Sequence, residues 1–318
     1  MDEQMKVEQV EEQVKAEDKK LTLSNVITAA VKLPGVKVNR EAFLRTVFEK
    51  LPKETVELIV EKGPINAGIS RELLKQKASR IIKERSALSS GASFLAGIPG
   101  GFAIAATIPA DIVQFYGIAL RMAQELVYLY GEEDIWCENT SDGDRVNNQL
   151  ILYCGVMLGA SGASQSVRVM SSALAKAALK KLPRMALTKT FYYPAIKATL
   201  AFFGVHINKT IFAQGVSKAL PVVGGVISGG ITLSTMMPMG YRLVKVLDKA
   251  HFDYTEKDLT ADMKVLEELE AKSKKRKKKK VSKSDSLQEL ERAKALLDNG
   301  VITEEEFNSI KEKVISKM

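Results

Sequence analysis

The sequence is poor in the residues that build disulfide frameworks and metal sites. Its 318 residues include two cysteines, two histidines and one tryptophan, and aromatic residues make up 6%. Two cysteines cannot form the multiple disulfides of small secreted domains, so we expect Cys137 and Cys154 to stay reduced. Residues 1–20 are charged and lack the apolar run of a secretory signal, which favours a cytoplasmic location. With so few aromatics, the composition favours closely packed helices over a β-sandwich.

The sequence also lacks the common catalytic and cofactor signatures. It has no phosphate-binding G-x-x-x-x-G-K-[ST] loop and no G-x-G-x-x-G motif after a strand. His206 and His251 are too far apart in sequence for a local metal site, and ordinary core or surface roles suit both better. Residues 159–163 resemble a nucleophile elbow but lack its closing glycine. We expect no cofactor, no metal and no catalytic residue. The sequence favours a non-enzymatic protein and leaves an enzyme of another type open.

Excess positive charge is confined to one segment. The chain has a net charge of +9, and residues 272–283 contain nine basic residues and no acidic one. The rest of the chain is therefore neutral, and the charge describes a patch rather than the whole surface. The members of this basic segment are Lys272, Lys274, Lys275, Arg276, Lys277, Lys278, Lys279, Lys280 and Lys283.

Three interpretations of the basic segment stay open. Lysines near a membrane attract anionic lipid, at about 1 kcal/mol for each residue close to the surface. The segment could instead bind nucleic-acid phosphates without sequence preference, or serve only as an extended, self-repelling linker. No aromatic residue is interleaved with the lysines, so bases have no stacking platform, and nucleic acid is the weakest of the three.

Apolar periodicity predicts helices through most of the chain. Residues 21–88 have helical spacing, with turns at Pro34-Gly35 and Gly63-Pro64 and an N-cap at Ser70. The stretch 110–131 predicts an amphipathic helix that starts at the cap residue Asp111 and ends at Gly131. Gln114, Arg121 and Glu125 share one face of this helix, and we interpret them as a solvent-facing or paired polar stripe.

Three uncharged runs, 86–110, 146–167 and 219–241, are each long enough to cross a membrane. However, only seven residues of the first run are strongly lipophilic, and prolines and glycines interrupt the first and the third. We therefore expect the first and the third to form Gly/Pro-rich apolar helical hairpins that pack in a bundle, with shallow or reversible insertion into lipid left open. Each run contains glycines four residues apart that would allow helices to approach closely: Gly97 with Gly101, Gly155 with Gly159, and Gly225 with Gly229.

The C-terminal part divides into a polybasic linker at 271–285 and a helical hairpin at 286–318. Thr303 and Glu306 have the spacing of a capping box at the start of the second helix. So short a hairpin cannot bury enough apolar surface to fold alone, so we expect it to need a partner or a second copy. Residues 1–20 are predicted to be a charged helix or disordered arm, and residues 21–270 a helical domain. The expected fold class is all-α.

Three stretches, 32–45, 93–131 and 220–247, resemble the EcsC protein family, and the resemblance spans about 21–255. Its most specific part contains Pro109-Ala110-Asp111 and Tyr130-Gly131. It implies a helical bacterial protein associated with an ABC transporter, without established catalytic residues. The last 33 residues resemble a SHOCT domain, which implies oligomerisation or contacts with other proteins. The residues that carry this second resemblance are Gly300, Ile302, Thr303, Glu306 and Phe307.

These observations favour a non-enzymatic accessory or adaptor protein at the cytoplasmic face of the membrane. The basic segment would bind anionic lipid, the hairpin would bind a second copy or another protein, and an ABC transporter is a further partner that the resemblance implies. One alternative is a soluble ligand-binding protein or enzyme with a cavity between the hairpins, in which polar groups such as Asp111 and Arg121 would converge. The other is a nucleic-acid-binding factor that acts through the basic segment.

Overall fold

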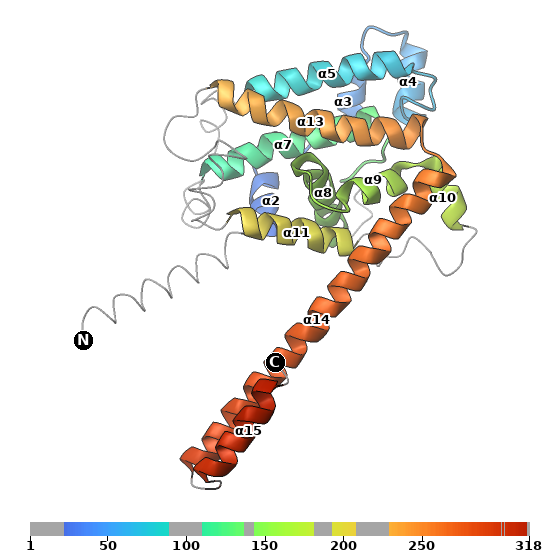
Figure 1. The fold of residues 1–318 in the computed structure, drawn as a ribbon. Coiled ribbons are helices and arrows are strands. Elements are labelled where there is room, and N and C mark those ends of the chain that lie inside the picture. Colours follow the sequence, from blue (N-terminus) through green and yellow to red (C-terminus); the bar gives the residue numbers. More distant parts are fainter. Residues whose placement is uncertain are drawn as a thin grey trace. The chain divides into compact units, whose positions relative to one another are not determined.

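The structure is a computed structural model that describes residues 22–88, 110–136, 143–180, 193–207, 229–299, 301 and 303–316. Every regular element within these ranges is an α-helix, which confirms the all-α prediction (Figure 1). The chain divides into two compact units, Met1–Leu266 and Glu267–Met318. The helices are α2 (Leu23–Val31), α3 (Arg40–Val47), α4 (Lys53–Lys62), α5 (Arg71–Leu88), α7 (Ala110–Leu129), α8 (Gly143–Leu158), α9 (Ala163–Ser171), α10 (Ala173–Lys180), α11 (Tyr193–Ile207), α13 (Gly229–Phe252), α14 (Glu256–Asp298) and α15 (Glu304–Ser316).

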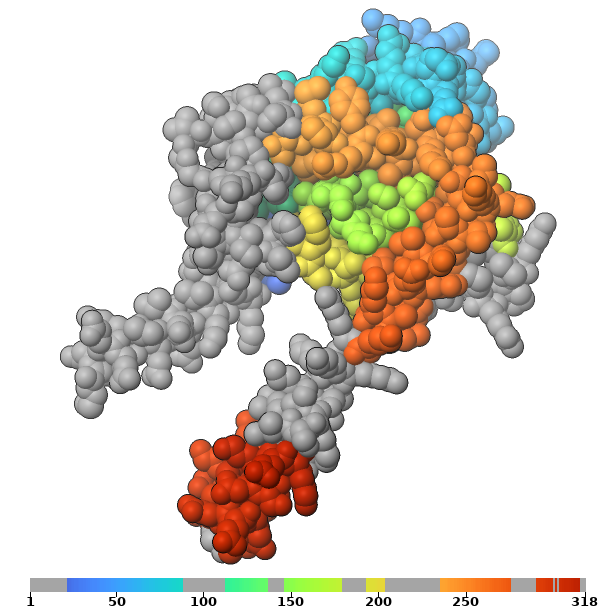
Figure 2. Space-filling view, in the orientation of Figure 1, coloured from blue at the N-terminus to red at the C-terminus, as the bar shows by residue number. Residues whose placement is uncertain are grey.

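Helix α7 forms the centre of the first unit. Helices α2, α3, α5, α8 and α13 all pack against it, and its side chains from Ile112 to Tyr130 are buried at all but two positions. A helix buried along nearly its whole length is stable only when other elements surround it. The helix is therefore more deeply buried than an amphipathic surface helix, and α5 and α13 are two of the helices that cover it. These two helices lie side by side in Figures 1 and 2.

Local signals at helix ends were predicted well. The Ser70 hydroxyl accepts a hydrogen bond from the Leu73 N–H (3.3 Å), as an N-cap residue does at the start of α5. Gly131 ends α7 with a φ of 89°. The N–H of Glu132 donates to the carbonyl of Val127 (3.0 Å) in the C-terminal motif that requires a left-handed residue. Such caps are formed by residues within one turn of the helix end, so the local sequence predicts them.

The predicted close-packing pair Gly155 and Gly159 has two different roles. A Cβ atom on Gly155 would lie 2.5 Å from Thr199 Oγ1 of α11 and 2.9 Å from Ala163 Cβ of α9, so three helices meet at this glycine. Gly159 does not pack against another helix. It has a φ of 80°, and no atom lies within 4 Å of its Cβ position. Its N–H and that of Ala160 close the C-terminal turn of α8, so this half of the pair is a helix-ending residue.

Two other glycines allow close contacts that the sequence analysis missed, one between two helices and one between a helix and the loop after α2. A Cβ atom on Gly240 of α13 would lie 2.7 Å from Ile82 Cγ1 of α5. A Cβ atom on Gly117 of α7 would lie 3.1 Å from Leu33 Cδ1 and 3.2 Å from Val36 Cγ2. Neither glycine belongs to a G-x-x-x-G pair in these helices, so no spacing pattern marked them.

Several predictions fall on segments outside the described residues. These include the N-terminal arm 1–20, most of the run 86–110, residues 219–228 of the run 219–241, and Cys137. The hairpins expected from the two runs therefore stay predictions, as do the packing roles of Gly97, Gly101 and Gly225. Gly229 is the first residue of α13. The middle run, 146–167, forms most of α8 and the start of α9. Within the described ranges, no helix is both long and apolar enough to cross a membrane.

The contact at Gly155 can be tested with Gly155→Ala. Because the added methyl group would overlap Thr199, we expect the free energy of unfolding in urea to fall by about 1–3 kcal/mol. Thr199→Ala removes the nearest atoms, so Gly155→Ala should cost less in that background, as a double-mutant cycle measures. An equal cost in both backgrounds would place the strain elsewhere.

The start of α14 generates a pH prediction. The carboxylate of Asp258 accepts hydrogen bonds from Lys249 Nζ (2.5 Å) and the Thr255 hydroxyl (2.8 Å), which lower its pKa from 3.8 to about 2. A carboxyl group whose pKa is lower in the folded than in the unfolded protein stabilises the fold at pH values above its unfolded-state pKa. This stabilisation is lost as the pH falls through the pKa of the folded state. Asp258→Asn should therefore reduce the free energy of unfolding at neutral pH, and its difference from the wild type should shrink between pH 4 and pH 2. The exposed Glu61→Gln is the control, and a gap that does not depend on pH would contradict the prediction.

Candidate functional site

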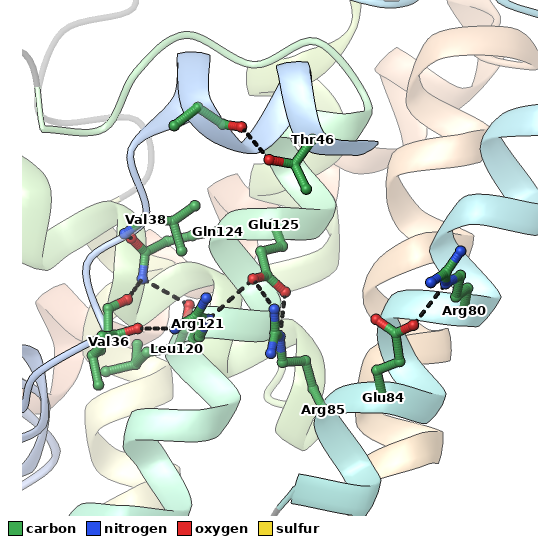
Figure 3. A network of polar contacts seen from close by, with 12 residues as sticks. Val36, Val38, Thr46, Arg80, Glu84, Arg85, Leu120, Arg121, Gln124 and Glu125 are labelled. Atoms are coloured by element: carbon green, nitrogen blue, oxygen red, sulfur yellow. Dashed lines mark hydrogen bonds and ion pairs between the residues drawn. The ribbon is translucent and has the colours of Figure 1, made fainter. Parts of the chain in front are cut away.

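Among the described residues of the first unit, the least exposed charged group is the Glu125 carboxylate on α7. Its side chain is 1% exposed and accepts hydrogen bonds from Arg85 Nε and Nη2 of α5, both at 2.6 Å (Figure 3). Arg121 Nε, one turn earlier on α7, donates to the same carboxylate at 3.1 Å. Two guanidinium groups thus balance one buried negative charge, which is the condition for burying a carboxylate at acceptable cost.

The neighbouring Gln124 is completely buried and ties two loops to α7. Its Oε1 accepts hydrogen bonds from the Val38 N–H (3.1 Å) and from Trp136 Nε1 (2.6 Å). Its Nε2 donates to the carbonyls of Val36 and Leu120, each at 2.9 Å. An amide side chain has two donor hydrogens and two acceptor positions, so Gln124 is fully satisfied. This arrangement positions the helix face on which Glu125 lies.

A pocket of about 210 Å³ opens above Glu125 and Arg85. Helix α3 and the turn after it form one side, α5 the other, and α7 the floor. Ile81 is buried and gives the pocket an apolar wall, whereas Arg80 and Glu84 form an ion pair at its exposed rim (2.6 Å). The lining residues are Phe43, Thr46, Val47, Glu49, Lys50, Lys77, Arg80, Ile81, Glu84, Arg85 and Glu125.

The predicted polar stripe on α7 is thus mainly a paired set of residues. Arg121 binds Glu125 and also donates from Nη1 to the carbonyl of Gly35 (2.6 Å). Asp111 lies in the first turn of α7, which begins at Ala110; its side chain is outside the described residues, so its capping role stays a prediction. Asp111 and Arg121 are separated by about 15 Å along the helix axis, so this example pair does not converge on one small ligand.

The remaining candidates for chemistry have structural surroundings. Cys154 is a free, buried thiol, and burial raises its pKa to about 12, which makes it a poor nucleophile. His251 stacks on Tyr130, and its Nε2 lies 3.6 Å from Glu132 Oε1. Ser161 of the elbow-like stretch 159–163 lies in the turn between α8 and α9. Among the described residues, no group of three His, Cys, Asp or Glu side chains could hold a metal ion.

The basic segment lies within helix α14, because Lys and Arg are good helix formers and α14 contains no Gly or Pro. The role of residues 271–285 as a polybasic linker stays a prediction. Glu270 also forms an i,i+4 ion pair with Lys274 (2.7 Å), and Lys272 and Lys275 are exposed. The other six basic residues belong to the same helix, and their side chains lie outside the described residues.

The second unit contains a helical hairpin formed by the end of α14 and by α15. Thr303 and Glu306 have the reciprocal contacts of a capping box: the Glu306 N–H donates to Thr303 Oγ1 (3.3 Å), and the Thr303 N–H donates to Glu306 Oε2 (2.9 Å). Ala293 and Val314 are buried, whereas Leu296 is 42% exposed and Val301 is 66% exposed. The hairpin thus has a small core and apolar side chains in contact with solvent.

The ion pairs of Glu125 can be tested with Glu125→Gln. The change leaves two arginines without their anion, so we expect the free energy of unfolding in urea to fall by about 2–4 kcal/mol, somewhat less than for a fully buried pair. The control is Glu84→Gln, which breaks an exposed ion pair and should change stability little. Equal effects of the two substitutions would show that burial of Glu125 is unimportant.

Comparison with known proteins identifies one domain. The family model described as SHOCT, a short C-terminal domain, matches residues 288–315. This range covers the end of α14 and nearly all of α15, which is the hairpin predicted from the sequence. The comparison gives no evidence for the EcsC family in the rest of the chain. No match was found among curated proteins or among solved structures. The chain therefore carries a SHOCT domain at residues 288–315.

Proposed function

We propose that the protein is a non-enzymatic adaptor that binds an anionic membrane surface through its basic segment and binds a partner through its SHOCT hairpin. The observation that carries this proposal is that both features belong to one element: α14 contains residues 272–283 and then supplies the first helix of the hairpin. A protein held at a surface by one part of a helix can present the next part to a partner.

The helical form of the basic segment favours attachment at the surface over insertion. Consecutive residues of a helix point about 100° apart, so eight nearly consecutive basic residues surround the axis and leave no apolar stripe. The segment is about 18 Å long, so its nine charges lie within one or two Debye lengths of each other at physiological salt. A field of this density attracts acidic headgroups, and each contact contributes about 1 kcal/mol.

The hairpin supplies the second contact of the proposed adaptor. Its exposed Leu296 and Val301 are suited to an apolar contact with a second copy of the chain or with another protein. If the resemblance of residues 21–255 to EcsC proteins reflects common ancestry, the partner belongs to an ABC-transporter system at the inner face of a bacterial membrane.

The proposal can be tested with vesicles that contain anionic lipid. A variant with Gln in place of the lysines at 274, 275, 277, 278, 279 and 280 should lose most of its binding in a flotation assay, because electrostatic attachment depends on these charges. The matched control has Gln in place of six exposed lysines elsewhere, so its net charge falls by the same amount. These lysines are Lys32, Lys53, Lys62, Lys83, Lys245 and Lys257.

The control variant should float with the vesicles as the wild type does. High salt should release the wild type and the control variant from the vesicles. Equal binding by all three proteins would overturn the proposal. If the wild type ignores vesicles but binds RNA or DNA in a strongly salt-dependent way, the basic segment has a nucleic-acid partner, and the adaptor proposal fails.

A further inference from the structure

The pocket above Glu125 presents unused hydrogen-bond donors at its floor. Arg85 binds the Glu125 carboxylate through Nε and one hydrogen of Nη2. A guanidinium group has five N–H donors, so Nη1 and the second hydrogen of Nη2 form a second edge. No hydrogen bond from this edge is found among the described residues. Glu125 therefore orients Arg85 and leaves free the second edge of the guanidinium group. This edge can donate two hydrogen bonds to another oxyanion in the same bidentate manner.

Lysines add further donors around this edge. Lys77 Nζ donates one hydrogen bond to the carbonyl of Val47 (2.8 Å), which holds the ammonium group at the pocket wall and leaves two N–H groups. Lys50 lies exposed at the rim. Of the three acidic side chains that line the pocket, Glu125 and Glu84 are engaged by arginines. The third, Glu49, is exposed and is opposed by both Lys50 and Lys77, so the charge that remains for a ligand is positive.

The number of donors favours a phosphate monoester over a carboxylate. Arg85, Lys77 and Lys50 together offer more N–H groups than the two oxygens of a carboxylate can accept, whereas a phosphate monoester has three terminal oxygens. The volume of about 210 Å³ corresponds to roughly seven water molecules, enough for a phosphate and a short carbon chain. Phe43, Val47 and Ile81 give the carbon chain an apolar wall.

We propose that this pocket binds the phosphate group of a small phosphate ester, with Arg85 and Lys77 as the main donors and Lys50 at the rim. Such a group can come from a soluble ester or from the headgroup of a phospholipid. The site contains no residue of α14, so this inference does not rest on the adaptor proposal.

Binding can be measured with glycerol 1-phosphate by titration calorimetry. The full-length variant with the six lysines at 274–280 changed to Gln is used, so that the basic segment does not contribute. We expect one bound molecule per chain, and a loss of at least tenfold in affinity when Lys50→Gln and Lys77→Gln are added, because contacts with a charged group are removed. Lys83→Gln, on α5 but outside the pocket, is the control and should leave the affinity unchanged.

The absence of binding at millimolar glycerol 1-phosphate, or an affinity unaffected by Lys50→Gln and Lys77→Gln, would overturn the proposal. An unchanged urea midpoint in these variants shows that a lost affinity is not caused by unfolding. Vesicles that contain phosphatidic acid, the phospholipid with a phosphate monoester headgroup, distinguish the two sources. Vesicle binding that depends on Lys50 and Lys77 assigns the site to a lipid headgroup, whereas binding of the soluble ester alone assigns it to a free metabolite.

Discussion

The burial of helix α7 along most of its length is the constraint on which the first unit depends. A surrounded helix can carry polar side chains only where each finds a partner, because an unsatisfied buried group costs several kcal/mol. Gln124 satisfies this condition through the backbone at residues 36–38 and through Trp136, and Glu125 satisfies it through Arg85 and Arg121. The same contacts hold the loop after α2 and the start of the loop after α7 in place. Burial of one helix thus determines the positions of the segments around it.

Close approach between helices is the second requirement of this bundle. With few aromatic side chains, the core gains its packing density from small residues at the points where helices cross. Gly155 lets α8 meet α9 and α11, and Gly240 lets α13 meet α5. The bundle therefore brings α5 close to α7 and α13, which is also what places Arg85 above Glu125.

Local features of the fold were predictable because their physical cause lies within a few residues. The caps at Ser70 and Gly131 and the all-α class follow from nearby sequence, as does the SHOCT hairpin. The roles of Gly155 and Gly159 could be separated only with the structure, since the same spacing fits both a helix contact and a helix end. The sequence analysis did not predict a helix through 271–285, because it considered the charge of this segment and its partners rather than the helix propensity of Lys and Arg.

The sequence by itself determined the helical class, the confinement of excess charge to residues 272–283 and the C-terminal hairpin, because these depend on composition and local spacing. The tertiary structure alone decided that Glu125 is a buried anion rather than part of a solvent-facing stripe. Its main partner, Arg85, is 40 residues away in sequence, and the loop bound by Gln124 is 86 residues away at Val38. No periodicity encodes such pairs, since they form only where packing brings separate helices together. The pocket exists for the same reason.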